Sequence, residues 1–233
     1  MPNYKTIREE AYEANMLLPK YRLVLMTFGN ASAADRAQGV FAIKPSGVAY
    51  EKLSPKDMVI VDFESKVVEG KWKPSSDTKT HAVLYSECPE ISGVVHTHST
   101  YATAWAQTLT DIPILGTTHA DHLTVDVPCA PPMKDAYIKG DYEYNTGYQI
   151  LDELKKRKLS YKEVEMILVG NHAPFTWGKT VDKAVYNSAV LESIAQMAFI
   201  SLTIAPKIKR MKKSLIDKHY ERKHGGNAYY GQE

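Results

Sequence analysis

Short apolar runs that alternate with longer amphipathic segments constrain the fold of this chain most strongly. Runs rich in β-branched residues and bounded by turn residues are typical of strands, and they lie at Val40–Ile43, Met58–Val61, Gly93–His98 and Met166–Val169. Apolar residues at helical spacing predict helices over Ile7–Leu18, Thr80–Glu87, Tyr101–Gln107, Tyr148–Lys158 and Val181–Ile204. Pro19 is expected to end the first helix. The pattern therefore predicts an α/β or α+β fold.

The composition is that of one ordinary globular domain. Of 233 residues, 44% are hydrophobic and 24% are charged, which suffices for a full core. We find no repeat, low-complexity tract or linker and expect a single domain over 1–233. The net charge of only +2 gives no bulk attraction to nucleic acid or to an anionic membrane. Because no run approaches the ~20 apolar residues of a membrane-spanning helix and the polar start lacks a signal-peptide pattern, we expect a cytoplasmic protein.

Two histidines, separated by one residue, predict a metal site. Side chains alternate along a strand, so His96 and His98 would project from the same face and reach one ion. His172, which follows the apolar run at Met166–Val169, is a candidate third ligand. Three neutral imidazoles with an open fourth position are typical of catalytic zinc sites. Since a lone HxH pattern also arises by chance, unrelated histidines are the alternative interpretation.

Other histidines compete for the place of the third ligand. His119 and His122 bracket Asp121, and either ring is able to ligate. Asp121 itself is a candidate acid/base group, because a nearby metal charge and burial both move the pKa of a carboxylate. His81 is expected to be a packed or exposed histidine on its helix. Cys88 and Cys129 lie far apart without CxxC spacing, so we expect no disulfide framework and only nitrogen and oxygen ligands.

Three polar segments supply donors for an anion. They are Thr27–Ser32, Lys44–Gly47 and Ser75–Thr78, each rich in the N–H and O–H groups that phosphate recognition requires. None matches a P-loop or a dinucleotide fingerprint, so ATP or NAD binding has little support. Taken alone, each segment is better explained as an ordinary turn or helix cap than as a phosphate site.

In their order along the chain, these segments resemble the class II aldolase and epimerase family, and within it the L-ribulose-5-phosphate 4-epimerases. The matching stretches are Leu17–Lys20, Thr27–Ser32, Ile43–Val48, Lys73–Thr78, Val95–Ser99, Gly116–Asp121, His172–Phe175 with Trp177–Gly178, Lys218–Tyr220 and Ala228–Gln232. They run almost from end to end, and as an ordered set they are specific. Two small departures, Asn171 for a serine and Ala173 for a glycine, leave His172 intact.

The resemblance implies a three-layer α/β/α sandwich with a central, mainly antiparallel sheet, assembled as a homotetramer with fourfold symmetry and with sites between adjacent subunits. It implies a zinc ion, or another divalent metal, held by His96, His98 and His172, with Asp77 as a ligand or close neighbour. Asp121 and Tyr230 match the acid/base pair of the family, and His219 matches an assisting position. The implied substrate- and phosphate-binding residues are Gly29, Asn30, Lys44, Ser46, Gly47, Ser75, Ser76, Thr117 and Glu143.

The implied activity is interconversion of L-ribulose 5-phosphate and D-xylulose 5-phosphate. Carbon 4 carries no acidic hydrogen, so its inversion is expected to proceed by retro-aldol cleavage of the C3–C4 bond. Zinc would stabilise the resulting enediolate as a Lewis acid, and re-addition to the other face of glycolaldehyde phosphate would invert the centre. An aldolase of the same family is the first alternative, and a non-catalytic adducin-like binding protein is the second. L-arabinose catabolism, an L-ascorbate route or another pentose pathway would supply the substrate.

Overall fold

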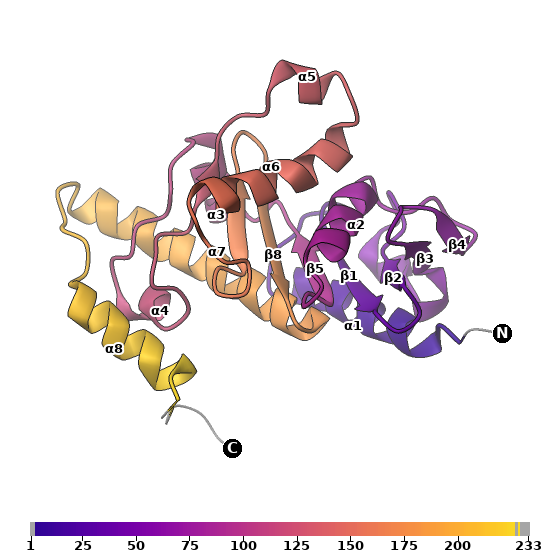
Figure 1. The fold of residues 1–233 in the computed structure, drawn as a ribbon, viewed down its shortest axis with the longest axis horizontal. Coiled ribbons are helices and arrows are strands. Elements are labelled where there is room, and N and C mark those ends of the chain that lie inside the picture. Colours follow the sequence, from indigo (N-terminus) through magenta and orange to yellow (C-terminus); the bar gives the residue numbers. More distant parts are fainter. Residues whose placement is uncertain (1–2, 227, 229–233) are drawn as a thin grey trace.

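An eight-stranded sheet forms the middle layer of the molecule (Figure 1). The computed structural model describes residues 3–226 and 228. The strand order is β4-β3-β2-β1-β5-β8-β7-β6, and every pair is antiparallel except β6 with β7. The strands are β1 (Asn30–Asp35), β2 (Val40–Ile43), β3 (Val59–Asp62), β4 (Val67–Glu69), β5 (Gly93–His96), β6 (Cys129–Ala130), β7 (Met166–Val169) and β8 (Pro174–Gly178).

Helices cover both faces of this sheet. They are α1 (Lys5–Lys20), α2 (Thr78–Glu87), α3 (Thr100–Gln107), α4 (Thr117–Ala120), α5 (Asp135–Ile138), α6 (Tyr142–Lys156), α7 (Val181–Ile204) and α8 (Lys213–His224), with 3-10 turns at Tyr50–Lys52 and Pro55–Asp57. On central strand β5, Val95 packs in the cluster that includes α1 and the start of α7, whereas Val94 packs in the cluster that includes α2 and α6. Adjacent side chains thus point to opposite buried faces. The predicted α/β/α sandwich with a mainly antiparallel sheet is confirmed.

Most of the predicted elements are present, with changed ends. β2, β7 and α7 occupy the predicted residues, and β3 is displaced by one. Strand β5 ends at His96, two residues before its predicted end, so His98 lies beyond the strand. Helix α6 begins at Tyr142 and not at Tyr148, because the side chain of Asp141 caps it by accepting from the backbone N–H of Tyr144.

Pro19 does not end α1, contrary to the prediction. The helix continues to Lys20, since a proline near the last turn removes only one backbone hydrogen bond. It ends instead where Arg22 adopts a φ of 58°. There the N–H of Leu23 donates to the carbonyl of Leu18 at 2.9 Å, as in other helix ends that use a left-handed residue.

Helix α7 is, among the described residues, the one helix whose length and apolar composition would suit a membrane span. Length and composition alone are weak evidence, since core helices of soluble proteins pass the same test. Here α7 packs on β5 and β8, and Ala184, Val185 and Leu191 are buried in the core. Its apolar character therefore has an explanation in the packing of this domain.

Candidate metal and anion site

Three histidines converge at one end of the central strands. His96 is the last residue of β5, His98 follows it, and His172 lies in the turn between β7 and β8. One ring nitrogen from each lies within 4.8 Å of the others. The ring centroids are 4.9 Å apart for His96 and His98, and 4.8 Å apart for His96 and His172. The structure thus brings the predicted pair together with His172 and not with His119 or His122, the two competing candidates.

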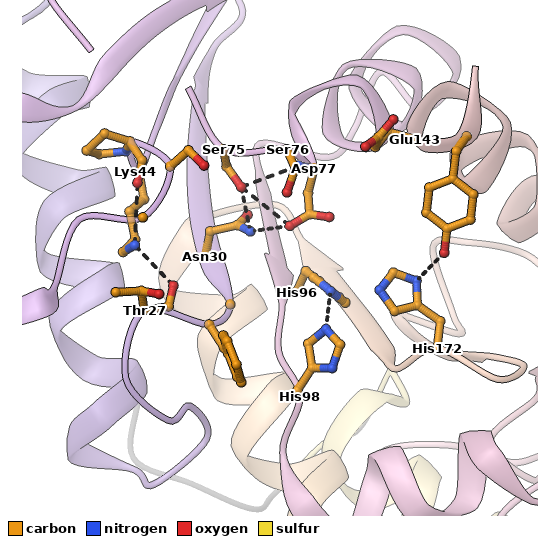
Figure 2. Close-up of a pocket in the computed structure, with 16 residues that line it drawn as sticks. Thr27, Asn30, Lys44, Ser75, Ser76, Asp77, His96, His98, Glu143 and His172 are labelled. Carbon is orange, nitrogen blue, oxygen red and sulfur yellow. Dashed lines mark hydrogen bonds between the residues drawn. The ribbon is translucent and has the colours of Figure 1, made fainter. Parts of the chain in front are cut away.

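Neighbouring groups orient two of these rings. His96 donates from Nδ1 to the carbonyl oxygen of Pro174 at 2.9 Å, and its ring stacks on Phe175 with centroids 4.1 Å apart. The hydroxyl of Tyr142 lies 3.4 Å from Nδ1 of His172, and this contact is drawn in Figure 2. Both contacts leave Nε2 directed at the centre of the triad. Partners of this kind on the outer nitrogen are usual for metal-binding histidines.

The donor set fits a divalent metal such as zinc. Nε2 of His96 and Nε2 of His98 are 3.2 Å apart, and two nitrogens bound to one tetrahedral zinc lie about 3.3 Å apart. Burial, followed by the charges of His96 and His98, lowers the pKa of His172 to about 3. Burial also lowers the pKa of His98. These two rings are therefore neutral at physiological pH, which is the protonation state that binds metal.

Asp77 joins the histidines to the polar side of the same cavity. Its Oδ2 accepts from Nδ2 of Asn30 at 2.6 Å, and that amide also donates to Oγ of Ser75 at 3.0 Å (Figure 2). Burial opposes ionisation of Asp77, but His96, His81 and the Asn30 amide together hold its pKa below the ordinary value. Asp77 is thus an anion beside the triad.

Lys44 is the cation of the polar side. Its side chain is only 2% exposed, and its Nζ donates to the carbonyl of Thr27 at 3.3 Å and lies 4.9 Å from the centre of the Tyr50 ring. Among the described residues no carboxylate forms an ion pair with it. Burial lowers the pKa of Lys44 to about 8, so the ammonium is mostly charged at neutral pH. A buried cation without an anionic partner is suited to an anionic ligand.

One cavity of about 460 Å³ connects these groups, which is within the usual range for small-molecule sites. Gly29 and Gly47 line it with positive φ angles of 74° and 68°. At Gly29 a Cβ atom would lie 2.9 Å from the carbonyl oxygen of His96, so this close approach requires glycine. The predicted residues that line the cavity are Gly29, Asn30, Lys44, Ser46, Gly47, Ser75, Ser76, Asp77, His96, His98, Glu143 and His172.

Three predicted site residues do not line this cavity in the single chain. Thr117 begins α4, Asp121 follows it, and His219 lies on α8. Asp121 forms a separate cluster in which its Oδ1 accepts from Nδ1 of His219 at 2.9 Å and its carboxylate accepts twice from Arg222, at 3.1 and 2.9 Å. Burial alone would raise the pKa of Asp121, but Arg222 and His219 outweigh it, and the pKa lies below the ordinary value. Tyr230 lies outside the described residues.

The sequence interpretation missed Tyr142, Phe175 and Arg222 as members of these two clusters. Tyr142 and Arg222 contact residues distant in sequence, which no local pattern reveals, although the basic run on α8 was a visible signal. His81 is expected from the sequence to be either packed or exposed on its helix, and the structure shows that it is buried. Its Nδ1 lies 2.7 Å from Oγ of Ser32, and burial lowers its pKa to about 3.

Comparison with known proteins agrees with this architecture. Residues 9–199 match the family model described as the class II aldolase and adducin N-terminal domain. Among solved structures, an L-fuculose 1-phosphate aldolase superposes with a TM-score of 0.79 at 22% identity, covering 95% of this chain and 97% of that chain. YgbL from Escherichia coli has a TM-score of 0.72 at 24% identity, with 93% and 98% covered.

A more distant structural match is the L-fuculose-1-phosphate aldolase from Thermus thermophilus, with a TM-score of 0.67, 21% identity, and 88% and 98% covered. At these identities the solved structures establish the shared fold. The family model spans most of the chain. The chain therefore belongs to the class II aldolase and adducin N-terminal domain family.

Proposed function

We propose that this protein is a cytoplasmic, zinc-dependent epimerase that interconverts L-ribulose 5-phosphate and D-xylulose 5-phosphate. One observation carries the proposal. The three histidines and Lys44, whose side chain is buried, line one cavity of about 460 Å³. A ligand that fills it would have a metal-binding group at one end and an anion at the other. A ketose phosphate has this arrangement.

The two ends of the cavity would divide the work of binding. Lys44, with the hydroxyl and amide groups of Ser46, Ser75 and Ser76, would hold the phosphate. A divalent metal on His96, His98 and His172 would supply Lewis-acid stabilisation of the negative charge that develops on the ketose oxygens. Because the phosphate anchors carbon 5, the opposite end of the pentulose is directed toward the histidines.

Inversion of carbon 4 requires proton transfer on both faces of that carbon. When the C3–C4 bond breaks, one group accepts the proton of the C4 hydroxyl, and after the aldehyde turns, a second group returns a proton on the opposite face. We assign these roles to Asp121 and Tyr230, assisted by His219. The low pKa of Asp121 keeps it ionised and able to accept a proton.

The position of Asp121 bears on the oligomeric state. Asp121 and His219 do not line the cavity of their own chain, so we propose a homotetramer in which an adjacent subunit presents them to it. Mixed assemblies test this arrangement. Asp121→Asn and His96→Asn chains, each inactive alone, should regain activity when refolded together. Some sites in the mixed assembly would then combine an intact His96 from one chain with an intact Asp121 from the adjacent chain. Absence of any regained activity would contradict a shared site.

A class II aldolase is the second candidate, because the solved structures that superpose on this chain include L-fuculose 1-phosphate aldolases. An aldolase would share the bond cleavage but release the aldehyde. A non-catalytic, adducin-like binding protein would not require three converging ligand histidines.

Product analysis separates the candidates. Zinc-loaded protein incubated with L-ribulose 5-phosphate should form D-xylulose 5-phosphate, with chelator-treated protein as the control. Free dihydroxyacetone and glycolaldehyde phosphate would instead identify an aldolase. No conversion of L-ribulose 5-phosphate would reject both assignments for this substrate.

A further inference from the structure

His98 differs from the other two histidines in how its ring is held. His96 is oriented by the carbonyl of Pro174 and His172 by the hydroxyl of Tyr142. Within the described residues, the hydrogen bonds of the His98 side chain are limited to the triad itself. Apart from a ring contact with Phe28, at 6.2 Å between centroids, its position therefore depends on the backbone on either side of it.

That backbone is anchored on one side by β5 and on the other by α3. His96 pairs with Asn30 of β1 and with Phe175 of β8, which fixes the strand end. Helix α3 begins at Thr100, two residues after His98. Displacement of the first turn of α3 would consequently move His98 relative to the other two ligands.

A carboxylate from a distant helix holds the first turn of α3. Glu192 of α7 accepts from the backbone N–H of Tyr101 through Oε1 and from that of Ala102 through Oε2, each at 2.9 Å. These are the N–H groups that an N-cap side chain normally satisfies. The N-cap residue, Ser99, makes no such hydrogen bond. The negative charge also interacts favourably with the positive end of the helix dipole.

We infer that Glu192 is a positioning residue for the metal site, which sets metal affinity by fixing the start of α3 and hence the place of His98. The inference rests on the proposed metal site. Glu192 acts through the backbone and touches neither the ligand nitrogens nor the cavity. Removal of the carboxylate frees two helix N–H groups and lets the first turn of α3 shift.

A purely structural role is the competing explanation, and the chain offers a matched control for it. Nε1 of Trp105 donates to the carbonyl of Ala195 at 3.0 Å, so this bond also ties α3 to α7. It lies near the far end of α3, away from His98. Trp105→Phe removes this bond and keeps an aromatic ring, which loosens the helix contact without freeing the first turn.

The test measures zinc affinity by competition with a chromophoric chelator, in wild type, Glu192→Ala, Glu192→Gln and Trp105→Phe. We expect Glu192→Ala to weaken zinc binding by about tenfold and Glu192→Gln by less, because one acceptor oxygen remains. Trp105→Phe should bind zinc as wild type does. The absorption spectrum of the cobalt-loaded protein should change in Glu192→Ala and remain unchanged in Trp105→Phe.

Each result has a distinct meaning. Zinc affinity within twofold of wild type in Glu192→Ala, or an equal loss in Trp105→Phe at a similar melting temperature, would overturn the positioning role. Wild-type protein that binds no zinc would instead overturn the metal site itself. A Glu192→Ala chain that fails to fold leaves Glu192→Gln as the deciding variant.

Discussion

Nδ1 of His96 lies 2.9 Å from the carbonyl oxygen of Pro174, the first residue of β8. A carbonyl only accepts, so the proton of the neutral ring resides on Nδ1 and the lone pair of Nε2 faces His98. The strand pairing of β5 with β8 therefore sets the tautomer of a candidate metal ligand. This coupling between sheet and site makes His96 the residue whose replacement should affect metal binding most directly.

His96→Asn should lose zinc. The shorter amide places no nitrogen at the centre of the triad, and two imidazoles bind zinc far more weakly than three, so we expect affinity to fall by at least about 100-fold. Metal analysis after dialysis measures the loss. His122→Asn is the control, since His122 contacts Tyr186 and lies apart from the triad. Wild-type zinc content in His96→Asn would contradict the assignment.

Affinity for a phosphorylated substrate should weaken as pH rises through 8. Burial holds the pKa of Lys44 at about 8, so the ammonium that would meet the phosphate is charged below that pH and neutral above it. We expect KM to increase between pH 7 and 9, and Lys44→Met to raise KM at pH 7 by about 10- to 100-fold.

The control for this pH effect is Lys73→Met, which alters a neighbouring lysine that is exposed and outside the cavity lining. It should retain the KM of wild type and its pH dependence. A KM for wild type that stays constant from pH 7 to 9 would remove Lys44 from the phosphate site.

Lys44→Met should also stabilise the fold at neutral pH. The folded protein releases the Lys44 proton near pH 8, whereas the unfolded chain keeps it to about 10.4. The buried charge is thus a cost below pH 8, and wild-type stability rises with pH between these values because the unfolded state binds more protons. Urea unfolding should show Lys44→Met more stable by on the order of 2 kcal/mol at pH 7, with a smaller difference at pH 9.5. A less stable variant at pH 7 would contradict this account.

The proximity of His96 and His98 could be predicted from sequence, although the backbone that presents them differs from the prediction. The expectation placed both residues on one strand, but β5 ends at His96. Their rings still meet, because the polypeptide is anchored at both ends of the short segment. Strand β1 could not be predicted, since Asn30–Asp35 contains only small and polar residues. It forms because it lies between β2 and β5, and such tertiary context overrides intrinsic propensity.

The cluster of Asp121, His219 and Arg222 was harder to predict, because it also depends on tertiary contacts. Asp121 and Arg222 are 101 residues apart, and a basic run such as that on α8 is usually a solvated face. Only the docking of α8 on α4 brings the guanidinium to the carboxylate. Family resemblance proposed Asp121 and His219 as site residues, and that assignment stays a prediction. Nothing in the spacing of the residues indicated that Arg222 would hold the same carboxylate.

Arg222 should determine the pH below which Asp121 becomes protonated and the activity is lost. The ionised carboxylate is the form that accepts a proton, so activity is lost as pH falls through the pKa of Asp121. Burial raises that pKa, and the hydrogen bonds from Arg222 and His219 bring it below the ordinary value. Arg222→Gln removes the charge and leaves burial in place, so the acidic side of the kcat/KM profile should move to higher pH by about one unit. Arg210→Gln, which breaks the ion pair of exposed Arg210 with Asp126, should leave the profile unchanged. If the acidic side of the profile stays in place in Arg222→Gln, Asp121 is not the group whose ionisation limits the reaction, and the base must be sought elsewhere.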